Sequence, residues 1–220
     1  MARDREYYNS LIKRGLYSLT YIVLSSLYPL TNKLTGRERE LTTALDNMIP
    51  FNKYFIYPYV YWYLYVAAFF IYFLLCDEEN YYKMLISLNV GVVISYMIYI
   101  IFPTTVPRPN FDPGGGLVGF LFKFVYSNDN PYNCLPSIHV LNTMTIAIYV
   151  QKDKLHLSKT IKILSIISAI LIIYSTFAIK QHVVLDAIAG TALSFGIYGA
   201  LHLKPYLAKK KSMQEVSNVQ

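Results

Sequence analysis

The sequence predicts an all-α integral membrane protein with six transmembrane helices and with both termini in the cytoplasm. Three observations lead to this prediction: an apolar composition, six apolar segments, and an uneven distribution of Lys and Arg between them. Of the 220 residues, 55% are hydrophobic and only 15% are charged, whereas soluble domains carry about 25% charged residues. A soluble bundle of buried helices is the alternative, and the lack of polar faces on the second, third and fifth segments disfavours it.

The apolar segments are residues 15–30, 54–76, 84–102, 137–150, 161–179 and 183–203. A helix needs about 20 residues to span a bilayer, so the fourth segment needs neighbouring residues to complete its span. The N-terminus is too polar for a cleaved signal peptide, and we expect the first span to remain. We therefore expect one domain over residues 1–220 with a basic cytoplasmic tail at about residues 204–220. Residues 32–53 are compatible with an interfacial helix.

The positions of the basic residues set the predicted orientation. With the N-terminus in the cytoplasm, 13 of the 20 Lys and Arg residues fall on the cytoplasmic side. The positive-inside rule favours this arrangement. It also accounts for the net charge of +7 without a nucleic-acid partner. We expect a multi-pass protein of the cell membrane whose basic tail faces the anionic inner leaflet.

Three polar clusters fall on the extracytoplasmic side in this topology. They lie in the stretches "FPTTVPRPNFDPGGG", "NPYNCLPSIHV" and "YSTFAIKQHVVLDAIAG". An ionisable group at membrane depth is costly, so such groups are by default candidates for function. The candidate residues are Arg108, Ser137, His139, Lys180, His182 and Asp186.

His182 and Asp186 are four residues apart, so on a helix they share one face. A carboxylate there accepts from one ring nitrogen of His182, fixes its tautomer and leaves the other nitrogen free as a nucleophile or base. The alternative is a His–Asp pair that only satisfies its own hydrogen bonds between helices. Acyl transfer by a Ser-His-Asp triad has less support, because the chain has no GxSxG motif.

Ser137 follows Pro136 and precedes an apolar run, which predicts a helix N-cap. A helix N-terminus binds anions, the Ser137 hydroxyl can add a donor, and His139 would lie in the first turn beside the anion. The alternative is an ordinary helix start with a chance histidine. Arg108 stands between two prolines that stiffen its backbone. Its guanidinium suits a pair of phosphate oxygens, although an isolated loop arginine is more often merely solvated.

Together the clusters suggest phosphoryl transfer without a metal or cofactor, because neither Cys76 nor Cys134 has metal-ligand spacing. His182 would attack phosphorus in line, and His139 would protonate the leaving oxygen. Arg108, Ser137 and nearby backbone N–H groups would hold the equatorial oxygens. Free histidine has a pKa of about 6.5, so a neutral and a protonated imidazole can coexist near neutrality.

The order of these motifs resembles the type 2 phosphatidic acid phosphatase superfamily. The resemblance implies a six-helix membrane core and metal-independent activity on a membrane lipid phosphate. It covers nearly the whole chain, and the ordered set is more specific than any single motif. The matching residues are Arg108 and Pro109 of the first motif, Pro136, Ser137 and His139 of the second, and Ser175, His182 and Asp186 of the third.

Two positions depart from the family pattern. Ile101 stands where the first motif has a lysine, and Thr176 stands where the third has an arginine. Lys180, one helical turn after Thr176, could serve the same phosphate oxygens. The stretch "STFAIKQH" resembles the branch that includes inositol-phosphorylceramide and sphingomyelin synthases, which transfer phosphoryl head groups between lipids. The departures put the acceptor in doubt more than the nucleophile.

Three functions stay open at this point. The first is a lipid phosphatase that acts on the class of phosphatidic acid, diacylglycerol pyrophosphate or polyprenyl pyrophosphate, with water as acceptor. The second is a lipid phosphotransferase with an alcohol acceptor, and the third is a non-catalytic membrane protein with the same fold. The chain contains no second domain that is recognisable as a site for an alcohol. The sequence does not indicate the lipid or the oligomeric state, and pairs such as Gly190 with Ser194 suit close helix packing within the monomer.

Overall fold

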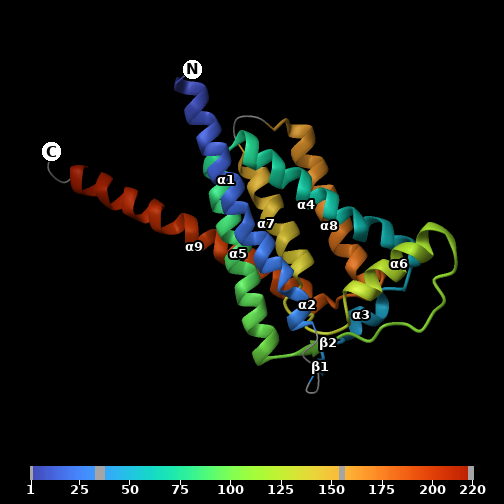
Figure 1. Ribbon diagram of the computed structural model, residues 1–220. Coiled ribbons are helices and arrows are strands. Elements are labelled where there is room, and N and C mark those ends of the chain that lie inside the picture. The colour runs from blue at the N-terminus through green and yellow to red at the C-terminus, as the bar shows by residue number, and fades with distance from the viewer. Residues whose placement is uncertain (1, 33–37, 154–156, 218–220) are drawn as a thin grey trace.

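The computed structural model describes residues 2–32, 38–153 and 157–217, and it forms a bundle of long helices (Figure 1). The predicted all-α class is confirmed, since the described residues add only two short strands to the helices. The long helices are α1 (Ala2–Ser26), α4 (Ile56–Cys76), α5 (Glu78–Ile101), α7 (Ile138–Lys152), α8 (Lys159–Ala178) and α9 (Val184–Ser217).

Four segments are long and apolar enough to cross a membrane, namely Lys53–Cys76, Glu78–Ile101, Lys159–Ala178 and Val184–Leu203. They correspond to the second, third, fifth and sixth predicted spans. The first predicted span, residues 15–30, covers the end of α1 and most of the short helix after it, Tyr28–Thr31. The fourth coincides with α7, which has only 15 residues. Six spans, the orientation of the termini and the single domain stay predictions. The predicted tail continues α9 as far as Ser217, and residues 218–220 lie outside the described part.

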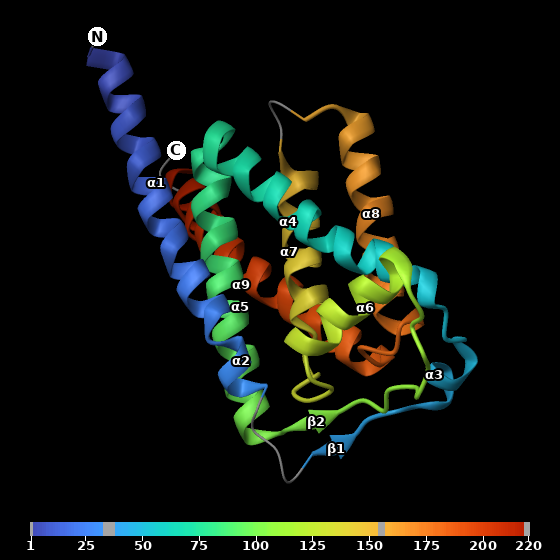
Figure 2. The same cartoon turned by 45° about the vertical axis from the view of Figure 1, so that its right-hand side comes forward.

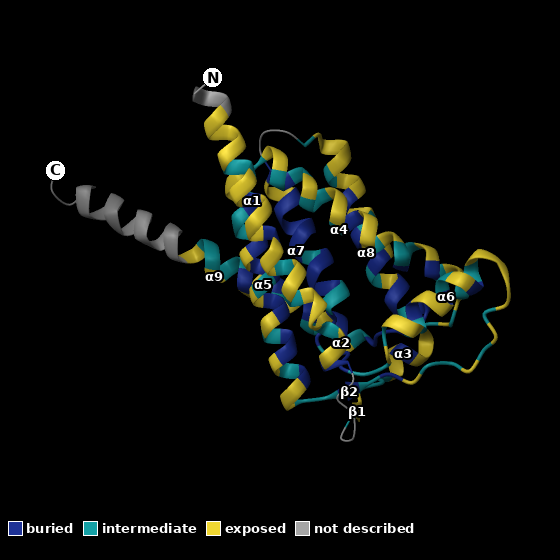
Figure 3. Cartoon of the chain, viewed as in Figure 1, coloured by how far each residue is buried: buried dark blue, intermediate teal, exposed yellow. Residues whose placement is uncertain are grey.

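Helix α7 occupies the centre of the bundle, where it packs against α4, α5, α8 and α9. In Figure 3, most of α7 is coloured as buried, and the helices around it have exposed outer faces. Those outer faces carry large apolar side chains, including Leu64 of α4 and Ile170 of α8, which are 64% and 63% exposed. In water such extensive apolar exposure would be a liability, but it suits contact with lipid chains.

The short elements gather at one end of the bundle (Figure 2). Of the expected interfacial helix over residues 32–53, residues 33–37 lie outside the described part, and the described residues form only the short helix α3 there, whose first turn Thr43 and Asp46 cap reciprocally. Strands β1 and β2 pair in parallel and join the segment before α3 to the loop after α5. These elements are α2 (Tyr28–Thr31), β1 (Arg39–Glu40), α3 (Ala44–Met48), η1 (Lys53–Phe55), β2 (Thr104–Thr105) and α6 (Gly116–Asn128).

Hydrogen bonds join the loops that carry the first and second motifs. The Thr104 side-chain oxygen accepts from the backbone N–H groups of Cys134 and Leu135, at 2.9 and 3.0 Å. The N–H of Asn133 donates to the Thr104 carbonyl at 2.7 Å. These bonds hold the loop before α7 in place against the loop after α5. The three polar clusters meet at this end of the bundle.

Candidate active site

His182 and Asp186 are in contact, but they do not share a helix face as the sequence predicted. Helix α9 begins at Val184, so His182 precedes it and Asp186 lies in its first turn. His182 Nδ1 lies 3.2 Å from Asp186 Oδ2, and the same oxygen accepts from the Val183 N–H at 3.0 Å. The carboxylate therefore caps the helix and orients the imidazole at once. The helix starts after His182 because the N–H groups of Gln181 and His182 are bonded to the Thr176 carbonyl in the preceding turn.

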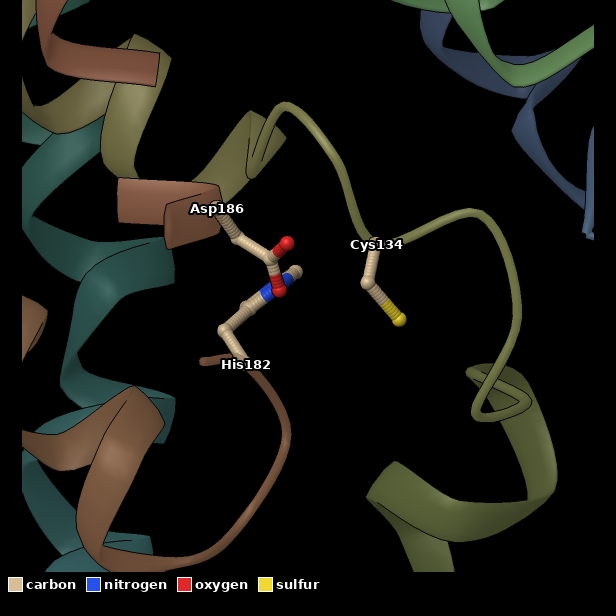
Figure 4. A group of neighbouring side chains, drawn as sticks. All are labelled: Cys134, His182 and Asp186. Carbon is tan, nitrogen blue, oxygen red and sulfur yellow. The ribbon is translucent and has the colours of Figure 1, made fainter. Parts of the chain in front are cut away.

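Figure 4 shows the His182 ring directed at the Asp186 carboxylate. Both side chains are buried, at 7% and 0% exposure. With Nδ1 facing a carboxylate, a neutral His182 carries its proton on Nδ1 and has a lone pair on Nε2. The arrangement suits a nitrogen nucleophile.

His139 lies beside His182, with 5.8 Å between the two ring centroids. It projects from the first turn of α7 and is held between the rings of Tyr59 and Trp62, with centroids 4.7 and 4.4 Å away. Its Nε2 atom is buried and has no hydrogen-bond partner among the described residues. The aromatic rings fix the imidazole while leaving this nitrogen free to exchange a proton with a ligand.

Ser137 is the N-cap of α7, as the sequence predicted, with Oγ accepting from the Val140 N–H at 3.3 Å. Its side chain is fully buried, and its N–H donates to the Asp186 carbonyl at 3.1 Å. Gly190 makes this junction possible, because a Cβ there would lie 2.8 Å from the Ser137 carbonyl oxygen. Ser137 thus fixes the start of α7 against the start of α9, and its direct contact with an anion stays a prediction.

Arg108 reaches across to the loop of the third motif. Its Nη2 donates to the carbonyl of Asp129 and to Oε1 of Gln181, both at 2.6 Å. The guanidinium also stacks over the Tyr126 ring, 4.3 Å from its centroid. Arg108 Nε is buried without a partner in the described structure. The guanidinium is therefore held in place through Nη2, and its buried Nε–H keeps a donor for a ligand.

Lys180 adopts a left-handed backbone conformation, with φ of 55°. Helix α8 ends at Ala178, so Lys180 lies in the turn after the helix and not on the helical turn that the sequence predicted. Its Nζ donates to the carbonyls of Asp46 and Ile49, at 2.9 and 2.6 Å. These two bonds tie the α3 segment to the turn and leave the ammonium one N–H to offer a ligand.

His182 lines two cavities. The first, which we call the basic cavity, has a volume of about 290 Å³ and is also lined by Arg108, Lys180 and Asp46. The second, the aromatic cavity, has a volume of about 230 Å³ and contains His139, Asp129 and seven aromatic residues in its wall. The predicted nucleophile therefore stands between a cationic compartment and an aromatic compartment that holds the second histidine.

Sequence reasoning missed two residues of this site. Gln181, directly before His182, accepts from Arg108 and keeps its own Nε2 buried and unpartnered. Asp46 Oδ1 accepts from the Val184 N–H at 2.7 Å and so holds the start of α9. Burial raises the pKa of Asp46, but hydrogen bonds from Thr43 and Val184 outweigh it and lower the pKa overall. Gln181 lies within the third motif, directly before His182, so the motif itself could have indicated it. No local signal in the sequence pairs Asp46 with α9.

The two positions that depart from the family pattern contribute no cation. Ile101 ends α5 with 78% of its side chain exposed. Thr176 is fully buried, and its hydroxyl donates to the Ile173 carbonyl at 2.7 Å. The Thr176 carbonyl accepts from the N–H groups of Gln181 and His182, so this residue shapes the turn that carries His182.

One group of buried side chains could hold a metal ion. Ligand atoms of Cys134, His182 and Asp186 lie within 4.8 Å of one another, a grouping that the sequence did not predict (Figure 4). Burial and the charges of Asp186 and Asp129 raise the pKa of the Cys134 thiol well above its usual value. Its neutral thiol is a poor ligand. Asp186 Oδ2 already orients His182, whereas Asp186 Oδ1 is buried without a hydrogen-bond partner among the described residues.

The fold and the site define a class: a helical membrane protein with two neighbouring histidines, one of them paired with a carboxylate. The histidine of that pair also lines a compartment that contains Arg108 and Lys180. The family model of the PAP2 superfamily matches residues 38–200. The chain belongs to this superfamily, as the three motifs predicted. No curated protein and no solved structure matches the chain.

Proposed function

We propose that this protein is a metal-independent membrane lipid phosphatase that acts on a lipid phosphate or pyrophosphate through a phosphohistidine. One observation carries the proposal: His182 is oriented by Asp186 and stands between Arg108 and His139. Membership of the PAP2 superfamily supports a phosphatase or a related phosphotransferase. The active site lies on the extracytoplasmic face of the cell membrane in this proposal.

In the proposed reaction, the phosphate enters the basic cavity. Three buried nitrogen atoms around His182 have no partner in the described structure, namely Arg108 Nε, Gln181 Nε2 and His139 Nε2. Unpaired buried donors are costly and are expected to receive an acceptor. Arg108 and Gln181 bind the equatorial oxygens, and Lys180 adds positive charge at the wall of the cavity.

His182 Nε2 attacks phosphorus while the bond from phosphorus to the lipid oxygen breaks, and Asp186 stabilises the cation that forms on the ring. His139 gives its proton to the leaving oxygen, and the negative charge of the bound phosphate favours the imidazolium form beforehand. His139 then takes a proton from water, whose oxygen attacks phosphorus and breaks the nitrogen–phosphorus bond. Phosphate leaves, and His182 is neutral again.

Trapping of the intermediate tests this proposal. Brief exposure to a phosphorus-labelled lipid should give wild type an acid-labile, alkali-stable label. His182→Ala should lose both the label and turnover, whereas Asp186→Asn should fold but turn over roughly 10²–10⁴-fold more slowly. A His182→Ala variant that still traps label and turns over normally would disprove the assignment.

His139→Ala separates the acid from the nucleophile. An aryl phosphate needs little protonation of its leaving oxygen, so the variant should cleave it far better than an alkyl phosphate. Equal losses on the two substrates would remove His139 from the acid role. An activity assay with and without diacylglycerol or inositol would distinguish hydrolysis from transfer to an alcohol. The substrates are phosphatidic acid, diacylglycerol pyrophosphate and polyprenyl pyrophosphate. The resemblance of the third motif to the head-group synthases is the reason to include these acceptors.

A further inference from the structure

The aromatic cavity has a polar wall that the proposed reaction does not use. Asp129, at the end of α6, lines it together with seven aromatic residues. Asp129 Oδ1 accepts from the Tyr28 hydroxyl at 2.6 Å, and Oδ2 accepts from the Tyr59 hydroxyl at 3.3 Å. These phenols orient the carboxylate but leave its negative charge in place.

No cationic side chain shares the aromatic cavity with this carboxylate in the described structure. Among the described residues, no Lys or Arg lines the aromatic cavity, and none forms an ion pair with Asp129. Arg108 donates to the carbonyl of Asp129 from the neighbouring basic cavity. A partly buried carboxylate without a cation is costly. Aromatic walls attract cations through the negative faces of their rings, and such cages bind ammonium groups.

Tyr59 connects this carboxylate to the reaction centre. Its ring lies against the His139 ring, with centroids 4.7 Å apart, while its hydroxyl bonds to Asp129. If an alcohol oxygen binds at His139 Nε2, a group a few atoms further along that alcohol would therefore reach the Asp129 carboxylate. In the proposed in-line attack, phosphorus lies between His182 Nε2 and the alcohol oxygen, and its equatorial oxygens face Arg108 in the basic cavity.

We propose that the aromatic cavity binds a cationic nitrogen, so that the alcohol released from the phosphate is an amino alcohol whose ammonium group pairs with Asp129. The inference rests on the proposed function. His182 forms the bond to phosphorus, the bond from phosphorus to the alcohol oxygen breaks, and that oxygen takes the proton of His139. The ammonium group keeps its own proton and leaves with the alcohol.

A direct binding test uses the protein's single tryptophan, Trp62, which lines this cavity. Choline should change Trp62 fluorescence saturably. Its uncharged analogue 3,3-dimethylbutan-1-ol should do so at least about tenfold more weakly, since a cation–π contact and an ion pair are both lost. Equal responses would show an apolar cavity and overturn the proposal, whatever the enzyme hydrolyses.

A kinetic test compares 2-aminooctadecyl phosphate with octadecyl phosphate. Wild type should prefer the amine by about tenfold or more in kcat/KM, and Asp129→Asn should remove most of that preference. Asp112→Asn removes an exposed charge from a neighbouring loop and should leave the ratio unchanged. A preference that survives Asp129→Asn, or no preference in wild type, would overturn this inference, whereas failure to hydrolyse either ester would count against the proposed function. Should Asp129→Asn not fold, the comparison of choline with its analogue on wild type decides.

Discussion

Replacing Gly190 by alanine tests the contact that holds the two histidines together. The added Cβ would lie 2.8 Å from the Ser137 carbonyl oxygen and 3.2 Å from the Leu141 nitrogen, both backbone atoms of the α7 start. Ordinary contact begins at 3.4 Å, so the helices must separate by about 0.6 Å. Overpacking of this kind costs about 1–3 kcal/mol. Because a shift of 1 Å can cost 10²-fold in rate, we expect kcat/KM to fall roughly tenfold.

The assay is steady-state hydrolysis of a lipid phosphate together with thermal unfolding in detergent. Gly196 supplies the matched control, because it lies in the same helix and a Cβ there would meet nothing within 4 Å. Gly196→Ala should keep full activity and gain about 0.5–1 kcal/mol from helix propensity. If Gly190→Ala behaved like Gly196→Ala in both measurements, the packing of α9 on α7 would not set the site geometry.

Three further changes test other parts of the site. Arg108→Lys should lower kcat/KM by about 10²-fold with little loss of thermal stability, since an ammonium lacks the planar fork that bonds Asp129 and Gln181 through Nη2 while Nε faces the phosphate. Unchanged kinetics would show that the guanidinium is structural. EDTA should leave activity intact, and a loss that a divalent ion restores would contradict the mechanism. In a cysteine-free background, a cysteine near Gly115 should react with an impermeant reagent outside cells and one near Lys210 should not; the reverse pattern would place the site in the cytoplasm.

Local signals in the sequence predicted the elements of the site well. Ser137 after a proline and before an apolar run predicted the N-cap of α7, and the structure places the cap there. The pattern of the three motifs predicted the superfamily, which the family match confirms. Four predicted spans coincide with helices long and apolar enough to cross a membrane. These features depend on composition and short-range geometry, which a single sequence contains.

Features that depend on tertiary contacts were predicted less well. His182 was expected on a helix, but the turn after α8 is closed by bonds to the Thr176 carbonyl, and α9 starts only at Val184. Lys180 was expected on a helical turn, whereas its ammonium bonds to carbonyls more than 130 residues earlier in the chain. A contact over such a separation has no periodic signature. The same reason hides Asp46, whose carboxylate holds the first turn of α9.

The charge balance of the two cavities bears on the substrate. Ile101 and Thr176 stand where the family pattern has two cations, and the wall of the basic cavity holds Arg108 and Lys180 against Asp46. A neutral donor such as Gln181 Nε2, which we propose binds a phosphate oxygen, neutralises less charge than a cation. The aromatic cavity adds the negative charge of Asp129. A site with less positive charge favours a less anionic ligand, so this balance favours a phosphate ester that carries its own cation over a pyrophosphate.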